Sequence, residues 1–332
     1  MKPINNVEKI RLKGGSLSGT YACKNDLGLI FVRKEVSLTE DREYGFQRWY
    51  SQLKRLQRYG EMFPGIFPKV MSYGCDEKLA YFDIEFIEDS QTLHEFVCNT
   101  NNTQLIDKVF NNLIHVMHKM HKVKIPSFES SFRLYIREEI EQKINECMTN
   151  DEFKKFSSYN EIIFNGEKII GFRKALNEYI KMFELIYKNP SETYTHGNLT
   201  LENILYQPKN NKIIFIDPYE ENIIDSALAE YSQVLQSSNS LYEIYNEATP
   251  VISGREISVS IKIPEGLEYF NKKFKSYMND ALTSDQIRVV RLLEISQFLR
   301  MLPFKMKVDK VKMIFFYALA SYLFHILKID LE

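Results

Sequence analysis

The segment Thr193–Asp217 reads TYTHGNLTLENILYQPKNNKIIFID and decides the fold of the chain. Asn198 and Asn203 lie near its start, and a run of β-branched and aromatic residues leads to Asp217 at its end. The residues that follow Pro208 predict a turn between two strands. Such a hairpin brings Asn203 and Asp217 side by side and offers one amide oxygen and one carboxylate. Oxygen ligands of this kind suit Mg²⁺ that carries substrate phosphates.

The same segment resembles the signature of a known superfamily. His196-Gly-Asn-Leu-Thr-Leu-Glu-Asn203, followed by Ile216-Asp-Pro218, is similar to the His-Gly-Asp, Asn and Asp motif of the aminoglycoside phosphotransferase and choline kinase-like superfamily, a relative of the protein kinases. The resemblance implies a bilobal α+β kinase-like fold, with a small N-terminal antiparallel β-sheet lobe that has one helix and a larger, mainly helical C-terminal lobe. It also implies ATP and Mg²⁺ as cofactors, with Asn203 and Asp217 as metal ligands.

Asn198 departs from the family motif. The resemblance places His196 and Asn198 in the catalytic loop, where the family has an Asp that accepts the proton of the substrate hydroxyl. An amide cannot take up that proton. We therefore expect an ATP-dependent phosphotransferase whose activity Asn198 impairs. Two alternatives stay open, a nucleotide-binding pseudokinase with a regulatory or scaffolding role, and an inactivated Asp-to-Asn form of an active kinase.

Composition limits the function classes. A chain of 332 residues with 44% hydrophobic residues can build one large or two modest cores. A net charge of -1 argues against a nucleic acid partner, which requires a basic surface. The 4 cysteines are scattered without zinc-site spacing, which indicates reduced thiols in a cytoplasmic protein. The N-terminus has no signal-peptide core, and the longest apolar run, residues 313–327, is too short to predict membrane insertion.

A glycine-rich turn opens the predicted N-terminal lobe. Residues 7–36 alternate as strands do, and residues 13–21 place three glycines between two of these strands. The backbone N–H groups of Gly15 and Ser16 can approach phosphates closely there. Since the spacing is not Gly-x-Gly-x-x-Gly, a Gly-Gly hairpin turn without a ligand is the alternative.

The next strand, residues 28–35, carries two neighbouring cations. A kinase-like fold requires one cation on this strand that contacts the α- and β-phosphates. Strand alternation directs Arg33 and Lys34 to opposite faces, so only one of them can do so. The Val-x-Lys pattern favours Lys34, and Arg33 remains the competitor.

A helix is predicted to follow. Ser37 and Glu40 have the spacing of a capping box, so we expect the helix to begin there. Phe46, Tyr50, Leu53 and Leu56 recur at helical spacing and predict its apolar face. We expect Glu43 to orient the strand cation by an ion pair, with Gln47 one turn later as a neutral substitute.

Residues 67–74 and 79–93 predict two further strands joined at residues 74–78. By resemblance, the backbone of Glu85 and Ile87 would pair with the adenine edge. The lobe boundary near Asp89 then gives a nucleotide-binding lobe of residues 1–88 and a lobe of residues 89–332 that holds the catalytic loop and the acceptor site. Helices are predicted over residues 92–99, 103–122, 132–148, 151–157, 171–188 and 267–329, with a helix opening at Asp225 and a strand at residues 257–263.

The resulting prediction is transfer of the γ-phosphoryl group from ATP to a hydroxyl of a small molecule. A sugar, a polyol or an amino alcohol would be the acceptor. Within the family, the variant motif looks closest to phosphotransferases linked to bacterial surface polysaccharides, so the resemblance implies a role in capsule or surface glycan synthesis. The sequence leaves the oligomeric state open.

Overall fold

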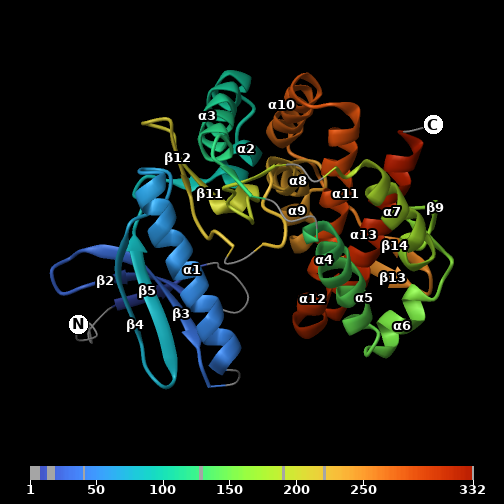
Figure 1. The fold of residues 1–332 in the computed structure, drawn as a ribbon, viewed down its shortest axis with the longest axis horizontal. Coiled ribbons are helices and arrows are strands. Elements are labelled where there is room, and N and C mark those ends of the chain that lie inside the picture. Colours follow the sequence, from blue (N-terminus) through green and yellow to red (C-terminus); the bar gives the residue numbers. More distant parts are fainter. Residues whose placement is uncertain are drawn as a thin grey trace. The chain divides into compact units, whose positions relative to one another are not determined.

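The computed structural model describes residues 8–12, 19–39, 42–126, 130–188, 191–219 and 222–330. The chain divides into two compact units, each assembled from three separate segments (Figure 1). Unit 1 comprises Met1–Phe96, Lys108–Met120 and His196–Asn222, and unit 2 comprises Val97–Asp107, His121–Thr195 and Ile223–Glu332. The hairpin that carries the sequence motif therefore belongs to the same unit as the N-terminal strands.

A five-stranded antiparallel sheet forms the first part of unit 1. Its order is β1-β2-β3-β5-β4, and helix α1 packs on β3, β5 and β4. The predicted strands before residue 36 are confirmed. The elements are β1 (Glu8–Arg11), β2 (Gly19–Lys24), β3 (Ile30–Ser37), α1 (Arg42–Met62), β4 (Val70–Cys75) and β5 (Leu79–Glu85).

Helix α1 differs from its prediction at its start and in its buried face. It begins at Arg42, because Ser37 is still paired in β3 and its hydroxyl contacts Thr39 instead of capping a helix. Glu40 lies outside the described residues. Phe46 and Tyr50 are exposed and stack on each other with ring centroids 5.9 Å apart. The buried residues are Gly45, Trp49, Leu53, Leu56 and Tyr59.

The buried face of α1 is determined by how closely the helix approaches β3. A Cβ on Gly45 would lie 2.9 Å from the carbonyl oxygen of Ser37, so the helix turns this glycine toward the strand. This contact sets the rotation of α1. Phe46 and Tyr50 consequently face away from the sheet, although their spacing matches an apolar face.

The predicted strand–turn–strand of the motif is confirmed. β11 (Ile204–Gln207) pairs with β12 (Lys212–Phe215), and β6 (Gln91–Thr92) adds a third strand on the other side of β11. Asn112 of α3 (Thr103–His121) donates to the carbonyl of Asn211 in the turn. Tyr206 of β11 is buried against the ring of Phe96.

Unit 2 is mainly helical, and α8 lies at its centre. Eleven of the twelve residues of α8 are buried, and α11 packs along it. The predicted C-terminal helix is interrupted and forms four helices, α10 to α13. The bounds of the remaining helices are α2 (Leu93–Cys98), α4 (Ser131–Tyr135), the π-helical turn η1 (Ile136–Glu141), α5 (Gln142–Cys147), α6 (Asp151–Ser157), α7 (Phe172–Ile186), α8 (Ala227–Ser238), α9 (Tyr242–Glu247), α10 (Glu265–Ala281), α11 (Ser284–Arg300), α12 (Leu302–Val308) and α13 (Lys310–Ile329), with the 3₁₀ turn η2 (Leu201–Asn203) in unit 1.

Helix α13 is longer than the apolar run predicted from the sequence. Its 20 residues have the length and mean hydropathy of a membrane span, and its most apolar stretch is 72% buried inside the protein. Phe315, Phe316 and Tyr317 are fully buried there. Helix α13 thus provides core residues of unit 2.

Two small sheets complete unit 2. β7 (Lys124–Ile125) pairs with β10 (Glu192–Thr193), and the other sheet has the order β13-β14-β8-β9. The strand predicted at residues 257–263 is shorter, because the side chain of Asn165 accepts from Val259 N–H and ends the ladder. The strands of this sheet are β8 (Glu161–Phe164), β9 (Glu167–Ile170), β13 (Val251–Ser253) and β14 (Glu256–Ser258).

Candidate active site

His196 is completely buried in unit 1 and joins two backbone segments. Its Nε2–H donates to the carbonyl of Ile216 at 2.7 Å, and its Nδ1 accepts from Asn198 N–H at 3.3 Å. The ring lies parallel to Phe67, with centroids 6.2 Å apart. Burial lowers the pKa of His196 to about 3, and the positive charge of Arg55 acts in the same direction. The neutral ring can therefore position the loop from within, without reaching solvent.

Gly197 allows the loop to turn beside His196. Its φ of +81° lies in the left-handed region, and a Cβ at this position would lie 2.1 Å from the side-chain nitrogen of Asn222. Any other residue would both strain the backbone and displace Asn222. The glycine of the motif is thus required by close approach as well as by conformation.

Asn198 and Asn203 are linked directly. The carbonyl of Asn198 accepts from Thr200 N–H at 2.9 Å and from Asn203 Nδ2 at 2.8 Å. Because Nδ2 of Asn203 is used in this bond, its Oδ1 is the atom available to a ligand. The Asn198 side chain is exposed and makes no hydrogen bond within the part of the chain that the structure describes.

Asp217 stands next to Asn203 and is paired with Lys34. Ile216 N–H donates to the carbonyl of Asn203 at 2.9 Å, and Asp217 lies two residues beyond the end of β12. Asp217 has a φ of +61° and its Oδ1 forms an ion pair with Lys34 Nζ. The Lys34 side chain is 7% exposed and that of Asp217 is 24% exposed. The structure thus brings Lys34, Asn203 and Asp217 together within unit 1.

Arg33 lies on the other face of β3, as the alternation of the strand predicts. Its Nε and Nη2 donate to the two carboxylate oxygens of Asp83 at 2.7 and 2.8 Å. Ser72 donates to Asp83 as well, and the guanidinium lies 4.3 Å from the ring centroid of Tyr81. This buried cluster occupies Arg33 in the fold, and Lys34 is the cation on the side of Asp217.

The helix residue near the site is Gln52, which sequence reasoning missed. Gln52 Nε2 lies 3.2 Å from the carbonyl oxygen of Pro218 and 3.5 Å from Asp217 Oδ1. Arg55 Nη1 donates to the carbonyl of Tyr219 at 2.6 Å. Glu43 is exposed in the first turn of α1 and takes part in none of the hydrogen bonds or ion pairs that connect described residues. Gln47 contacts Ser51 on the exposed side of the helix.

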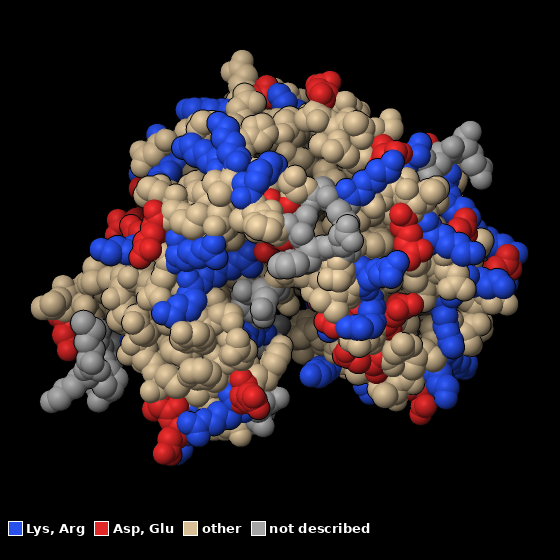
Figure 2. Space-filling view, in the orientation of Figure 1, with Lys and Arg blue, Asp and Glu red and all other residues tan. Residues whose placement is uncertain are grey.

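Helix α1 carries more basic than acidic side chains. Figure 2 shows Lys and Arg side chains gathered over the helix. The chain as a whole has a net charge of -1, so the basic residues of α1 are a local feature that favours an anionic ligand. They are Arg42, Arg48, Lys54, Arg55 and Arg58, against Glu43 and Glu61.

Thr20 is a second residue that the sequence did not indicate. It lies directly across from Lys34 in the ladder between β2 and β3, so the two side chains share one face of the sheet. Its hydroxyl is buried and has no hydrogen-bond partner in the described ranges. A buried polar atom without a partner is costly, so a bound ligand or water that supplied the missing hydrogen bond would stabilise the fold. Gly15 and Ser16, predicted to approach phosphates nearby, lie outside the described residues.

Glu85 and Ile87 lie at the end of β5 and just after it. Glu85 N–H donates to the carbonyl of Lys69 at 2.9 Å, and the Ile87 carbonyl accepts from the Ser90 hydroxyl at 2.7 Å. One backbone polar group of each residue is therefore already used within the fold.

The donor set fits Mg²⁺. Asn203 Oδ1 and the Asp217 carboxylate are hard oxygen ligands, and Mg²⁺ is commonly held by one or two such groups together with substrate phosphates. Among the described residues, no group of three His, Cys, Asp or Glu side chains could hold a metal without such help. Burial raises the pKa of Cys98 and of Cys147 to about 12, which disfavours these two thiols as nucleophiles.

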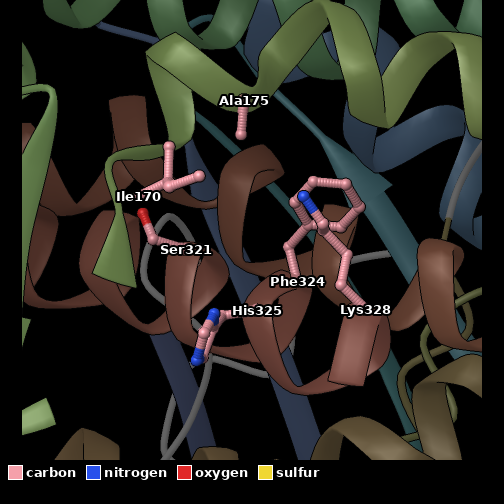
Figure 3. Close-up of a pocket in the computed structure, with 6 residues that line it drawn as sticks. All are labelled: Ile170, Ala175, Ser321, Phe324, His325 and Lys328. Carbon is pink, nitrogen blue, oxygen red and sulfur yellow. The ribbon is translucent and has the colours of Figure 1, made fainter. Parts of the chain in front are cut away.

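A small pocket in unit 2 does not offer a second site. Figure 3 shows the side chains that line it. Ser321 accepts from Phe172 N–H, and His325 and Lys328 pair with Glu167 and Glu178. The pocket is lined by Ile170, Ala175, Ser321, Phe324, His325 and Lys328.

Comparison with known proteins identifies the fold. A protein described as a fructosamine-3-kinase, from Haemophilus somnus 129PT, matches 96% of this chain and 92% of its own, with a TM-score of 0.59 and 11% identity. This chain has a kinase-like fold. An aminoglycoside-3'-phosphotransferase of type VIII matches 87% of this chain and 93% of its own, with a TM-score of 0.51 and 16% identity. A GDP complex of a variant of aminoglycoside 2'-phosphotransferase-IIIa matches 98% of this chain and 91% of its own, with a TM-score of 0.56 and 13% identity.

No family model matches the sequence, and no curated protein matches it. The comparisons therefore establish the architecture and confirm the α+β kinase-like fold that the motif implied. At these identities they carry no activity over to this chain.

Arg33 and Lys34 should differ in their effects on stability. Arg33→Met leaves the Asp83 carboxylate buried without its partner, which should lower the free energy of unfolding by about 3–5 kcal/mol. Lys34→Met leaves Asp217 partly exposed to water and should cost no more than about 1 kcal/mol. Denaturant titration of both variants measures the difference. Equal losses would show that Arg33 is not the structural cation.

His196 should make stability depend on pH. The unfolded chain binds a proton at His196 near pH 6.5, whereas the folded protein does so only near the lowered pKa of about 3. The folded state therefore loses stability as the pH falls below about 6.5, by about 2 kcal/mol between pH 6.5 and 5. Denaturant titrations at both pH values test this. His196→Gln should be less stable at pH 6.5 and should lose about 2 kcal/mol less on acidification; an equal loss contradicts the assignment.

Proposed function

We propose that this protein is a Mg²⁺-dependent phosphotransferase that transfers the γ-phosphoryl group of a nucleoside triphosphate to a hydroxyl of a small molecule. The observation that carries the proposal is the pairing of Lys34 with Asp217 beside Asn203, on a kinase-like fold. In such folds a strand lysine contacts the phosphates, and an Asn and an Asp hold the metal. Each of these residue types is present here.

The proposed roles follow from the chemistry and the positions of these side chains. Lys34 would contact the donor phosphates, and the hydroxyl of Thr20 on the same face would accept or donate one further hydrogen bond. Asn203 Oδ1 and the Asp217 carboxylate would hold Mg²⁺. When bound, Mg²⁺ neutralises charge on the phosphate oxygens. Gly15 and Ser16 remain proposed backbone contacts to the phosphates.

The nucleobase would pair with the backbone after β5. Since Glu85 N–H and the Ile87 carbonyl are used within the fold, the Glu85 carbonyl and the Ile87 N–H would pair with the base. Backbone groups alone do not favour one purine strongly. ATP is the proposed donor, and GTP has to be compared with it, because one structural neighbour is a GDP complex.

The proposed acceptor is a small, hydroxyl-rich molecule. Two structural neighbours are named for aminoglycosides and one for fructosamine, and these compounds carry several hydroxyls and an amine. A sugar, a polyol or an amino alcohol fits that chemistry. The role in surface glycan synthesis rests on the motif resemblance alone. A cytoplasmic location is the setting in which ATP and Mg²⁺ are supplied.

Asn198 sets the expected rate. In the transfer, the acceptor oxygen bonds to the γ-phosphorus, the bond to the bridging oxygen breaks, and the hydroxyl proton must leave. Asn198 can accept a hydrogen bond from the hydroxyl but cannot hold the proton, which would pass to water. A general base contributes about 10²–10⁴-fold. From a kinase rate of about 1–100 s⁻¹, its loss leaves on the order of 10⁻⁴–1 s⁻¹.

A second candidate function is supported by the same residue. Asn198 at the position of the base is the observation that favours a pseudokinase, which would bind nucleotide and act through a protein partner. An Asp-to-Asn form of an active enzyme would give the same site. The two experiments below separate binding from turnover.

Nucleotide binding should depend on Mg²⁺. At about 100 times its dissociation constant, the nucleotide should stabilise the fold by roughly 2.7 kcal/mol. Calorimetric titration of ATP and GTP, with Mg²⁺ and with EDTA, gives both affinities. Asp217→Ala should remove the metal dependence while the protein stays folded, and Lys34→Met should weaken binding in both buffers. The absence of heat and of thermal stabilisation with either nucleotide would exclude the proposal.

Asn198→Asp should raise the turnover number by at least about tenfold, because it restores the general base. The assay measures nucleotide consumption against a panel of sugars, polyols and amino alcohols. Asn210→Asp, in the exposed turn of the hairpin, is the matched control, since it makes the same change away from the site. If Asn198→Asp binds the nucleotide and phosphorylates nothing in the panel, the pseudokinase function replaces the enzymatic one.

A further inference from the structure

Two side chains of α1 reach the backbone that follows Asp217. Gln52 Nε2 contacts the carbonyl oxygen of Pro218 at 3.2 Å and Asp217 Oδ1 at 3.5 Å. Arg55 Nη1 contacts the carbonyl oxygen of Tyr219 at 2.6 Å. The guanidinium of Arg55 is itself fixed, because its Nε and Nη2 donate to the Tyr59 hydroxyl at 3.1 and 2.9 Å. All of these residues belong to unit 1.

These contacts matter because Asp217 has an unusual backbone conformation. Its φ of +61° is uncommon for a residue with a side chain and persists only where the surroundings fix it. On one side, the carbonyl of Ile216 accepts from His196. On the other side, Tyr219 N–H donates to the His196 carbonyl at 3.0 Å, and α1 holds the carbonyls of Pro218 and Tyr219. Helix α1 thus fixes the C-terminal half of the turn.

The chemistry of Gln52 suits this place better than an acid would. A carboxylate at position 52 would repel Asp217, whereas the amide donates to it and carries no charge. Lys34 and Gln52 both use Oδ1 of Asp217, so Oδ2 is the oxygen that we assign to the metal. Through Gln52, helix α1 thus contacts the proposed metal ligand Asp217 directly. Lys34 is paired with the same carboxylate.

We infer that Gln52 and Arg55 are positioning residues that hold the Asp217 carboxylate in place for the metal. The inference rests on the proposed function, because it concerns the same metal ligand. It adds to that function a direct connection from α1 to the metal site. A shift of α1 would therefore change metal affinity before it changed the contacts of the nucleobase.

The test replaces Gln52 by a side chain of similar size that cannot hydrogen-bond. Nucleotide affinity of Gln52→Met is measured with Mg²⁺ and with EDTA. Residues that orient metal ligands change metal affinity by about 10- to 100-fold. We expect a loss of that size with Mg²⁺ and a change of less than about twofold with EDTA, since only the metal ligand is disturbed.

Gln47→Met is the matched control. Gln47 lies on the same helix, carries the same side chain and contacts only Ser51 on the exposed face among the described residues. Its replacement should leave both affinities unchanged. Arg55→Met should also weaken binding with Mg²⁺, and its lost positive charge should add a smaller loss with EDTA. Arg55→Lys should recover part of both losses because it keeps one donor and the charge.

A purely structural role would give a different result. If Gln52→Met weakens binding equally with Mg²⁺ and with EDTA, or if it equals Gln47→Met, the inference is wrong. Mn²⁺ binding to the nucleotide-free protein, followed by electron paramagnetic resonance, is the second measurement, and Gln52→Met should weaken it. If the wild type binds Mn²⁺ but no nucleotide, only the proposed function fails. If it binds neither, both fail.

Discussion

The two hydrogen bonds of the His196 ring connect the segments that carry the candidate site. The ring donates to Ile216 beside Asp217, the proposed metal ligand, and accepts from Asn198 in the proposed catalytic loop. Only a neutral imidazole has one donor and one acceptor, so the connection requires the low pKa that burial gives to His196. The relative position of Asn198 and Asp217 therefore depends on keeping water away from this ring.

The hairpin and the opposite directions of Arg33 and Lys34 could be predicted from the sequence. Both depend on residues close together in the chain, where turn chemistry and strand alternation act. Asn203 and Asp217 are only fourteen positions apart, and one antiparallel ladder brings them together. The fold class followed from the same motif, because its residues occur in a recognisable order.

Gln52 and Thr20 could not be predicted in the same way. Gln52 meets Asp217 across 165 positions, and the sequence contains no local signal for that contact. The rotation of α1 was misjudged because Phe46 and Tyr50 are apolar and yet exposed. One pattern in the sequence could have indicated the face of α1 that lies near the candidate site. It is the polar and aromatic series at helical spacing formed by Arg48, Gln52, Arg55 and Tyr59.

The division of unit 1 among three segments affects how the protein is made. The ribosome completes the first segment, which ends at Phe96, long before the last one, which ends at Asn222. At about 5–20 residues per second, the delay is roughly 6–25 s. Phe67, which packs against His196 and Phe215, lacks both partners during that interval. Part of the Phe67 ring is thus exposed until the hairpin is synthesised, and transiently exposed apolar surface of this kind favours aggregation.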